Sequence, residues 1–390
     1  EVEYLQLFIN NKDVVVDCCR VLKRCQVVDD ETQLNILTTT MLVMNSFSKD
    51  AKIHLAIAEM LLSLSQFANA SPKMVRLEVY NALMKSMNTF SNSPKHVEAI
   101  LRALIVILRA ATTPTSFVSW SNLRTLYRVA GDYREDDTIL TLTARVLEAV
   151  APTSAAELVK TGFVDIMLFG VKNSGDRTCI IACCDALAAL ACCSECLYIL
   201  SQQACSNEVL HIIKTYSADA DVTAAALGLL AAMCNSDDSL REMDSAHFVK
   251  ELWAVLVSFI AEERVVALCA RVINALARSQ EGSHKELMAC FDKGVYCTIL
   301  KSHAASEGVL AGALSLLSLH MRDMKKQPLA PELDLVAFCE QALTTFADSI
   351  SVCGACFELM RESLVTLKLK SVVASGQTFF SAVEHSMGLV

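Results

Sequence analysis

The sequence predicts an all-α protein, a right-handed α-solenoid of about nine stacked helical repeats. Hydrophobic residues make up 53% of its 390 residues, and only 12 glycines and 6 prolines are present to punctuate the many short strands of a sandwich or barrel. The most apolar helical segments also recur at a nearly constant interval along the chain. Long helices separated by brief polar breaks therefore fit this composition better than a β architecture.

The recurring feature is an apolar segment that ends in a strong hydrophobic residue before a polar break. Nine such residues, here called the anchors, lie between 40 and 46 residues apart. They are Leu22, Leu64, Leu108, Val150, Leu190, Leu230, Leu276, Leu317 and Leu359. A steady interval of about 42 residues indicates repeats that each bury an apolar face against the next one. The helix that ends near each anchor is called a closing helix below.

Helical periodicity sets the bounds of several closing helices. They are expected at 97–110, 178–191, 222–233, 265–277, 309–320 and 352–360. A second amphipathic segment precedes four of them, at 164–171, 208–216, 248–259 and 295–302. Five of the six prolines fall after a closing helix, and Pro94 falls just before one, where a missing N–H is tolerated. Each repeat is therefore expected to contain at least two helices joined by a polar hinge.

Three segments resemble the bend between the first two helices of an armadillo repeat, which is built around a glycine. They lie at 158–164, 291–295 and 373–377 and contain Gly162, Gly294 and Gly376. Segment 185–191 resembles an armadillo closing helix. The resemblance implies one armadillo/HEAT-like solenoid over residues 1–390, armadillo-like at 151–390 and less regular, HEAT-like, at 1–150. It also implies a protein that binds other proteins along the concave face.

The best-known armadillo proteins hold an extended peptide with an asparagine one position before the anchor. In this sequence that position holds no asparagine. Its residues are Val21, Ser63, Ile107, Ala149, Ala189, Leu229, Ala275, Leu316 and Glu358. The chain therefore departs from the nuclear-import adaptors, and their binding residues are not carried over to it.

Charge and composition exclude several classes of protein. A net charge of −9 argues against nucleic acid as a partner, because phosphate binding requires concentrated Lys and Arg. The longest uncharged apolar runs, such as 224–234, reach about half of the ~20 residues that a membrane span needs, so membrane insertion is not expected. The 17 cysteines lie mostly in apolar helical runs, which predicts reduced core residues and a cytoplasmic location, with cytoskeletal or nuclear association also compatible.

The cysteines also offer the main alternative chemistry. Seven of them crowd residues 179–205, and Cys193 with Cys196 and Cys353 with Cys356 have the two-residue gap of metal or redox motifs. Either these thiols pack in the core, or the cluster is a metal-binding or redox-sensing module with a reactive Cys196. The eight histidines show no helical metal-site spacing, and no nucleophile motif is present. We therefore expect no cofactor, no metal and no enzymatic activity.

Charge gives a hint of a partner site. Arg102 and Arg109 lie seven residues apart on one closing helix, and Arg145 lies on the next, so they are candidates for binding an acidic partner segment. The alternative is a solvated face on which these arginines pair with nearby acids of the chain. Those acids would be Asp132, Glu135, Asp136 and Asp137. Acidic hinges are also expected along one edge, and they would suit a basic protein surface. They contain Asp219, Asp221, Asp237 and Asp238.

The leading hypothesis is a non-catalytic scaffold or adaptor, a subunit of a hetero-complex that the resemblance places among cytoskeletal or ciliary assemblies. One alternative is the regulatory or targeting region of a multidomain enzyme whose catalytic domain lies outside these residues. The other is the cysteine-rich metal- or redox-sensing module. Because the first helix is interrupted at Glu1 and the last repeat lacks its closing helix, the sequence is expected to be a fragment of a longer chain.

Overall fold

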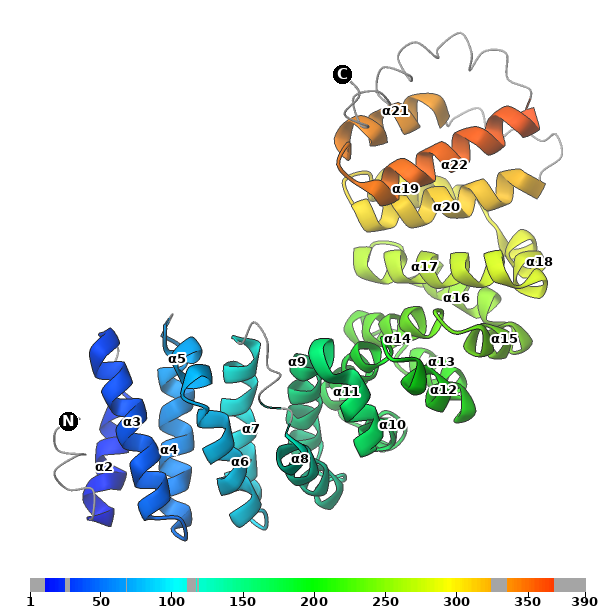
Figure 1. The fold of residues 1–390 in the computed structure, drawn as a ribbon. Helices are drawn as coiled ribbons and strands as arrows, with labels where there is room; N and C mark the ends of the chain where they lie inside the picture. Colours follow the sequence, from blue (N-terminus) through cyan, green and yellow to red (C-terminus); the bar gives the residue numbers. More distant parts are fainter. Residues whose placement is uncertain are drawn as a thin grey trace. The chain divides into compact units, whose positions relative to one another are not determined.

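The fold is all-helical. A computed structural model describes residues 11–24, 29–67, 69–110, 117, 119–323 and 335–367, and no β-strand occurs among them (Figure 1). The predicted α-solenoid is confirmed, while the number of repeats stays a prediction. In these ranges no helix combines the length and the apolar character needed to cross a membrane.

The chain forms two compact units, residues 1–199 and 200–390. Unit 1 contains α2 (Lys12–Leu22), α3 (Asp30–Ser46), α4 (Ala51–Leu64), α5 (Ala70–Arg76), α6 (Val79–Thr89), α7 (Pro94–Arg109), α8 (Trp120–Asp132), α9 (Asp137–Thr161), α10 (Phe163–Asn173) and α11 (Arg177–Leu190). Helix α12 (Ser194–Gln202) begins in unit 1 and ends in unit 2. The predicted change of repeat character near residue 150 stays a prediction.

Unit 2 continues the same helical pattern. It contains α13 (Cys205–Thr215), α14 (Ala220–Met233), α15 (Asp237–Ser245), α16 (Phe248–Ser258), α17 (Glu263–Ser279), α18 (Glu281–Cys290), α19 (Lys293–Ser302), α20 (Glu307–Asp323), α21 (Leu335–Thr345) and α22 (Ile350–Leu367). The closing helices predicted in this unit at 222–233, 265–277, 309–320 and 352–360 correspond to α14, α17, α20 and α22. Each observed helix contains the whole of the predicted range.

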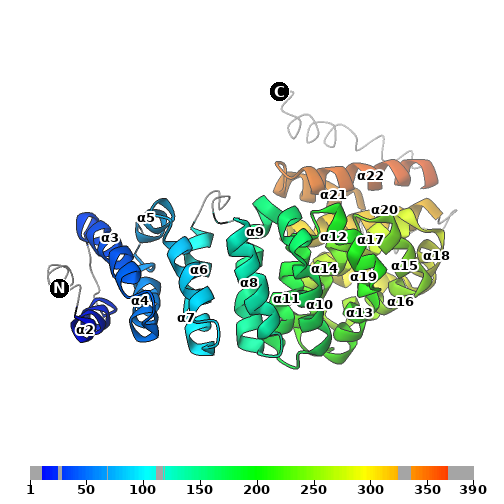
Figure 2. The ribbon, with the colours of Figure 1, turned by 60° about the horizontal axis from the view of Figure 1, so that its bottom comes forward.

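The closing helices form the core of each unit. In unit 1 they stack in the order α2, α4, α7, α9 and α11, and in unit 2 in the order α14, α17, α20 and α22 (Figures 1 and 2). Every anchor is buried on its closing helix, with at most 3% of its surface exposed. Burying a side chain of this size contributes about 1.5–3 kcal/mol. The anchor positions predicted from the sequence are therefore the positions at which neighbouring repeats are held together.

Capping residues in the hinges determine where the closing helices begin. Asp50 accepts hydrogen bonds from the backbone N–H groups of the first turn of α4, and Asp136, Asp176 and Asp219 do the same for α9, α11 and α14. A side-chain oxygen at this position satisfies backbone donors that have no partner within the helix. Pro94, predicted to fall just before a closing helix, is the first residue of α7.

Pro72 and Pro152 follow the anchors Leu64 and Val150, as predicted, but both lie inside helices. Pro72 is the third residue of α5, where its missing N–H has no intrahelical partner to lose. Pro152 lies within α9, two residues before Ser154, whose φ of −150° and ψ of 28° break the helical path. Helix α9 is thus a closing helix joined through a kink to the first helix of the following repeat.

The predicted glycine bend is correct at one of the two described positions. Gly162 has a φ of +98° and separates α9 from α10. Gly294 is wrong as a bend residue: it lies in the first turn of α19 and donates its N–H to Asp292, which caps that helix. The third glycine, Gly376, lies outside the described residues. Equivalent bends at Glu78, Ala204 and His247 have positive φ without glycine.

Candidate functional site

Arg102 lies beside a groove on the exposed side of the closing helices of unit 1. Its side chain is about half exposed, and its guanidinium donates to Glu98, one turn earlier on α7, at 2.8 Å. Two adjoining depressions lie along these helices. One, of about 350 Å³, lies over α2 and α4, and the other, of about 400 Å³, lies over α4 and α7. Because both are lined by Lys23, Leu55 and Glu59, they form one continuous feature, called here the α4 groove.

The α4 groove has a basic rim and an apolar floor. Its cations are Arg20, Lys23, Lys52, Lys95 and Arg102, and its carboxylates are Glu59 and Glu98. Five positive and two negative side chains leave an excess of three positive charges, in a chain whose net charge is −9. The floor includes Leu55 and Leu62, both partly exposed. This combination suits a ligand that carries both acidic and apolar groups.

The cations of the α4 groove differ in how strongly they are already engaged. Lys23 pairs with Glu59 at 2.7 Å, and Arg102 pairs with Glu98. Lys52 and Lys95 have no ion pair within the described part of the chain. These two ammonium groups can therefore bind an incoming carboxylate without breaking an existing pair. Exposed pairs such as Lys23–Glu59 are weak, about 0–1 kcal/mol, and can exchange partners.

One cysteine also lines the groove, and its chemistry is that of a core residue. The side chain of Cys19 is 2% exposed, and burial, assisted by the neighbouring Cys18, raises its pKa to about 12. At neutral pH the thiol therefore stays protonated, and a thiol is a poor nucleophile compared with a thiolate. The α4 groove thus offers recognition chemistry rather than a reactive group.

Arg109 and Arg145 belong to an ion-pair network beside the groove. Glu148 on α9 pairs with Arg109 at 3.6 Å and with Arg145 at 2.9 Å, and Arg145 also pairs with Asp185 on α11 at 2.8 Å. Burial opposes the charge of Arg145, but hydrogen bonds from its guanidinium to Glu148 and Asp185 outweigh it and raise its pKa. Arg145 therefore ties α9 to α11, and of the three predicted arginines only Arg102 lines the α4 groove.

The acids that pair with these arginines are not the ones expected. None of Asp132, Glu135, Asp136 and Asp137 pairs with Arg102, Arg109 or Arg145 among the described residues; the partners are Glu98, Glu148 and Asp185. The expected acids cluster at the turn between α8 and α9, where Asp136 caps α9. These three arginines instead pair one turn apart on a helix, or with a neighbouring closing helix about 40 residues away.

Sequence reasoning missed Lys23, Lys52 and Lys95, although a signal for two of them was present. Lys52 and Lys95 are 43 residues apart, and so are Glu59 and Arg102, which is one repeat interval. Charged residues that recur at the repeat interval occupy equivalent places on successive closing helices. The repeat interval therefore relates Lys52 to Lys95 and Glu59 to Arg102, four of the seven charged residues that line the groove.

The acidic hinges were expected to lie along one edge, and this prediction is wrong. Asp219 caps the beginning of α14 and Asp221 lies in its first turn, whereas Asp237 and Asp238 follow the end of α14 in the first turn of α15. The two pairs are therefore separated by the length of α14, ~21 Å for 14 residues. Their positions fit helix capping and the favourable interaction of acids with helix N-termini.

Five of the seven cysteines at 179–205 are buried in the helical core, whereas Cys192 is exposed and Cys193 is partly exposed. Cys179 and Cys183 lie one turn apart on α11 with their sulfurs 4.0 Å apart, and both are fully buried. Cys196, expected to be partly exposed, is 0% exposed, because it faces the interior side of α12. Over the described residues, no group of three or more His, Cys, Asp or Glu side chains is arranged to hold a metal ion.

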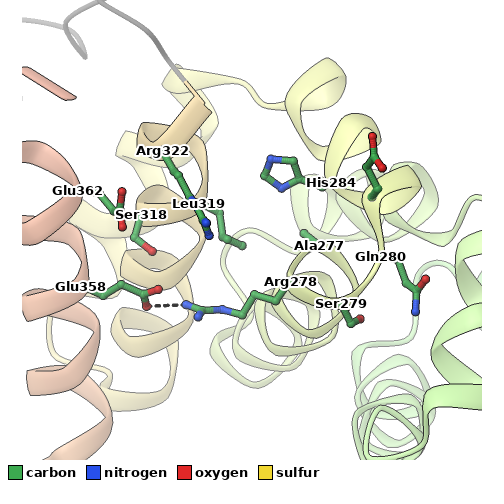
Figure 3. Close-up of a pocket in the computed structure, with 11 residues that line it drawn as sticks. Ala277, Arg278, Ser279, Gln280, His284, Ser318, Leu319, Arg322, Glu358 and Glu362 are labelled. Carbon is green, nitrogen blue, oxygen red and sulfur yellow. Dashed lines mark hydrogen bonds and ion pairs between the residues drawn. The ribbon is translucent and has the colours of Figure 1, made fainter. Parts of the chain in front are cut away.

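Unit 2 has its own depression, a pocket of about 510 Å³ at the C-terminal ends of α17 and α20 (Figure 3). Arg278 of α17 reaches toward Glu358 of α22 and pairs with it at 2.5 Å, while Arg322 and His284 border the same space. Two arginines and three glutamates line this pocket, so, unlike the α4 groove, it has no excess of basic groups.

Solved structures similar to this chain include armadillo-repeat solenoids. One, reported with a phosphorylation switch that controls the interaction between cadherin and β-catenin, has a TM-score of 0.68 at 14% sequence identity and covers 96% of this chain and 80% of that one. The complex of SYS-1 with POP-1 has a TM-score of 0.51 at 10% identity and covers 94% and 84%. At these identities the likeness establishes the fold alone. No protein-family model and no curated protein sequence matches the chain.

Proposed function

We propose that this protein is a non-catalytic scaffold that binds a partner protein through the α4 groove. The observation that carries the proposal is the excess of basic side chains around an apolar floor, on the exposed side of the closing helices α2, α4 and α7. An acidic segment with apolar side chains would place its carboxylates near Lys52 and Lys95 and its apolar groups on Leu55 and Leu62. The partner would be an acidic, amphipathic protein segment.

Two further observations support this role. Stacked repeats present an extended surface on which binding depends on shape and charge, and no catalytic group is needed. Among solved structures with the same fold, one is described as a complex of SYS-1 with POP-1, and another is reported with the interaction between cadherin and β-catenin. By the same reasoning we infer that the protein acts as a subunit of a hetero-complex, in a reducing compartment suited to its many free thiols.

A site-directed crosslinking experiment tests the proposal. A photoreactive amino acid at Leu62, on the groove floor, should crosslink a defined partner in native cells, identified by mass spectrometry. The same amino acid at Lys85, which is exposed on α6, serves as the control. An identical set of crosslinked proteins from the two positions would contradict the proposal.

Charge reversal tests the electrostatic part. The double variant Lys52→Glu with Lys95→Glu should weaken binding of the captured partner by at least tenfold, because two attractive contacts become repulsive. The double variant Lys85→Glu with Lys160→Glu changes the net charge equally on exposed residues outside the groove and should have little effect. If both double variants weaken binding alike, only the overall charge of the chain is involved.

A further inference from the structure

A row of three arginines follows the exposed side of α17 in unit 2. Successive members of the row, Arg264, Arg271 and Arg278, are seven residues apart, so they lie on one face of the helix. All three are exposed, while the opposite face of α17 carries the buried residues that pack in the core. We call these three residues the α17 arginine row. None of its members belongs to the α4 groove.

Only one of the three arginines forms an ion pair with a described residue of the chain. Arg264 and Arg271 have no ion pair with any described residue. Arg278 pairs at 2.5 Å with Glu358, which lies 80 residues away on α22 (Figure 3). Because α20 packs between α17 and α22, this ion pair passes over α20. Glu358 therefore demonstrates, within the molecule, how a carboxylate is held by a member of the row.

The surface beside the row is formed mainly by small side chains. Between the arginines the exposed side of α17 carries the partly exposed Ala267, Leu268 and Ala275, and Gly308 of α20 faces Ala267. On α14, a Cβ added at Gly228 would meet no atom within 4 Å, so the space beside that residue is open. Small side chains let the backbone of a ligand approach closely, while the long arginines stand above the surface.

We propose that the α17 arginine row binds a partner helix whose carboxylates recur every seven residues. Seven residues of α-helix span ~10.5 Å, so acids at this interval on a partner helix laid along α17 match the spacing of Arg264 and Arg271 on a single face. In an extended segment, side chains on one side recur at ~6.6 and ~13 Å and would not match both arginines. Arginine is suited to this recognition because its guanidinium binds a carboxylate through two parallel hydrogen bonds.

Glu358 competes with a partner's carboxylate for Arg278. A third carboxylate of the partner helix would have to displace Glu358 from Arg278. The partner therefore binds two open arginines and exchanges with one internal acid. Neutralising Glu358 should strengthen binding, whereas neutralising Arg264 and Arg271 should weaken it.

Binding of designed peptides to the full chain tests the proposal. Two fluorescent, alanine-rich helical peptides of identical composition are compared, one with Glu at every seventh position and the other with Glu at every fifth, which spreads the charges around the helix. Affinity is measured by fluorescence anisotropy at low salt. The peptide with seven-residue spacing should bind at least tenfold more tightly. Equal binding of the two peptides overturns the proposal.

Variants locate the site. Arg264→Gln with Arg271→Gln should reduce the affinity for the seven-residue peptide about tenfold, whereas Arg241→Gln with Lys250→Gln, the matched control on exposed residues of α15 and α16, should change it less than twofold. Glu358→Gln should raise the affinity two- to threefold. An equal loss in both double variants, or no gain from Glu358→Gln, contradicts the assignment. Lys52→Glu with Lys95→Glu should leave this affinity unchanged, which separates the inference from the function proposed for unit 1.

Discussion

Single residues at the bends between helices are held in the left-handed backbone conformation. Gly162 adopts it without strain, but Glu78, Ala204 and His247 adopt it with φ between 48° and 57°. For a residue with a Cβ this conformation costs about 1–2 kcal/mol. The stacking of the helices on either side therefore enforces the bend even where the sequence offers no glycine.

Ala204→Gly should stabilise the protein by about 0.5–1 kcal/mol. Glycine removes the left-handed strain, and part of that gain is lost because glycine has more freedom in the unfolded chain. Ala204 is exposed, so no packing is lost. The free energy of unfolding in urea measures the effect.

Gly162→Ala is the reciprocal variant and should destabilise the protein by about 1–2 kcal/mol. The new Cβ would lie 3.1 Å from the ring of Tyr127 at a φ of +98°. An unchanged free energy of unfolding for Gly162→Ala would show that the bend can relax without cost.

Two buried histidines share one serine in unit 1. Ser86 lies 2.8 Å from His54 Nδ1 and 2.9 Å from His96 Nε2, and the other nitrogen of His54 lies 3.1 Å from the carbonyl oxygen of Phe47. If His54 donates to that carbonyl, Ser86 donates to His54 and accepts from His96. His96 Nδ1 is then buried without a hydrogen-bond partner, so both rings are held neutral.

Acid should destabilise unit 1 through His96. Burial, together with the nearby His54, lowers the pKa of His96 from 6.5 to about 4, and burial also lowers the pKa of His54. The unfolded chain therefore binds a proton more readily than the folded chain. The stability from a neutral His96 is complete above pH 6.5 and is progressively lost, by up to about 3 kcal/mol, as the pH falls toward 4.

The measurement is the free energy of unfolding in urea at pH values from 7.5 to 4. The variant His96→Gln keeps a donor for Ser86 but cannot titrate, so it should lose less stability over this range than the wild type. Acids elsewhere in the chain titrate in both proteins, and their contribution cancels in the difference. Parallel pH profiles for the two proteins would rule out His96 as the source.

At the scale of the helices, side chains from one repeat satisfy backbone or carboxylate groups of another. Serines in three hinges donate to an acid at the first position of the preceding closing helix, at 2.6–2.7 Å. The pairs are Ser174 with Asp137, Ser306 with Glu263 and Ser349 with Glu307. In a second type of contact, Asp244 of α15 accepts from the backbone N–H and the hydroxyl of Ser283 in α18. These contacts fix the register of neighbouring repeats.

Asp244→Ala should destabilise the protein by about 1–2 kcal/mol. Helix α18 has no cap from its own N-cap residue, Gln280, so Asp244 takes that role from another helix. Urea unfolding gives the magnitude, and faster hydrogen exchange at the beginning of α18 gives the location. Asp238→Ala, which removes an exposed acid from the same helix α15, is the control and should change stability by less than about 0.5 kcal/mol.

At the scale of the whole molecule, each repeat should be stabilised mainly by its interfaces with the adjacent repeats. Leu104 on α7 is fully buried, and Leu104→Ala should cost about 2–5 kcal/mol. In a repeat array this loss is felt mainly by adjacent repeats. Hydrogen exchange should accelerate in α4, α7 and α9 but not in α17 or α20. Uniform acceleration throughout the chain would indicate that it unfolds as one cooperative body.

The sequence by itself determined the helical class, the positions of the anchors and the bounds of most closing helices. It could do so because burial against a stack imposes a helical period within each segment and a repeat interval between segments, and both are visible along the chain. Every predicted anchor is buried. Part of the candidate site was visible in the same way, since Arg102 stands on a face defined by helical spacing.

Only the tertiary structure decided the bends without glycine, the pairing of Arg145 with Asp185 and the burial of Cys196. It also decided which exposed cations line a groove. The physical reason is that these features depend on contacts between residues about one repeat apart or more. The repeat interval relates Lys52 to Lys95, but it does not show that their side chains border a groove. The stacked helices impose the left-handed conformation at Ala204, and they bring the charges of Lys52 and Lys95 to one groove.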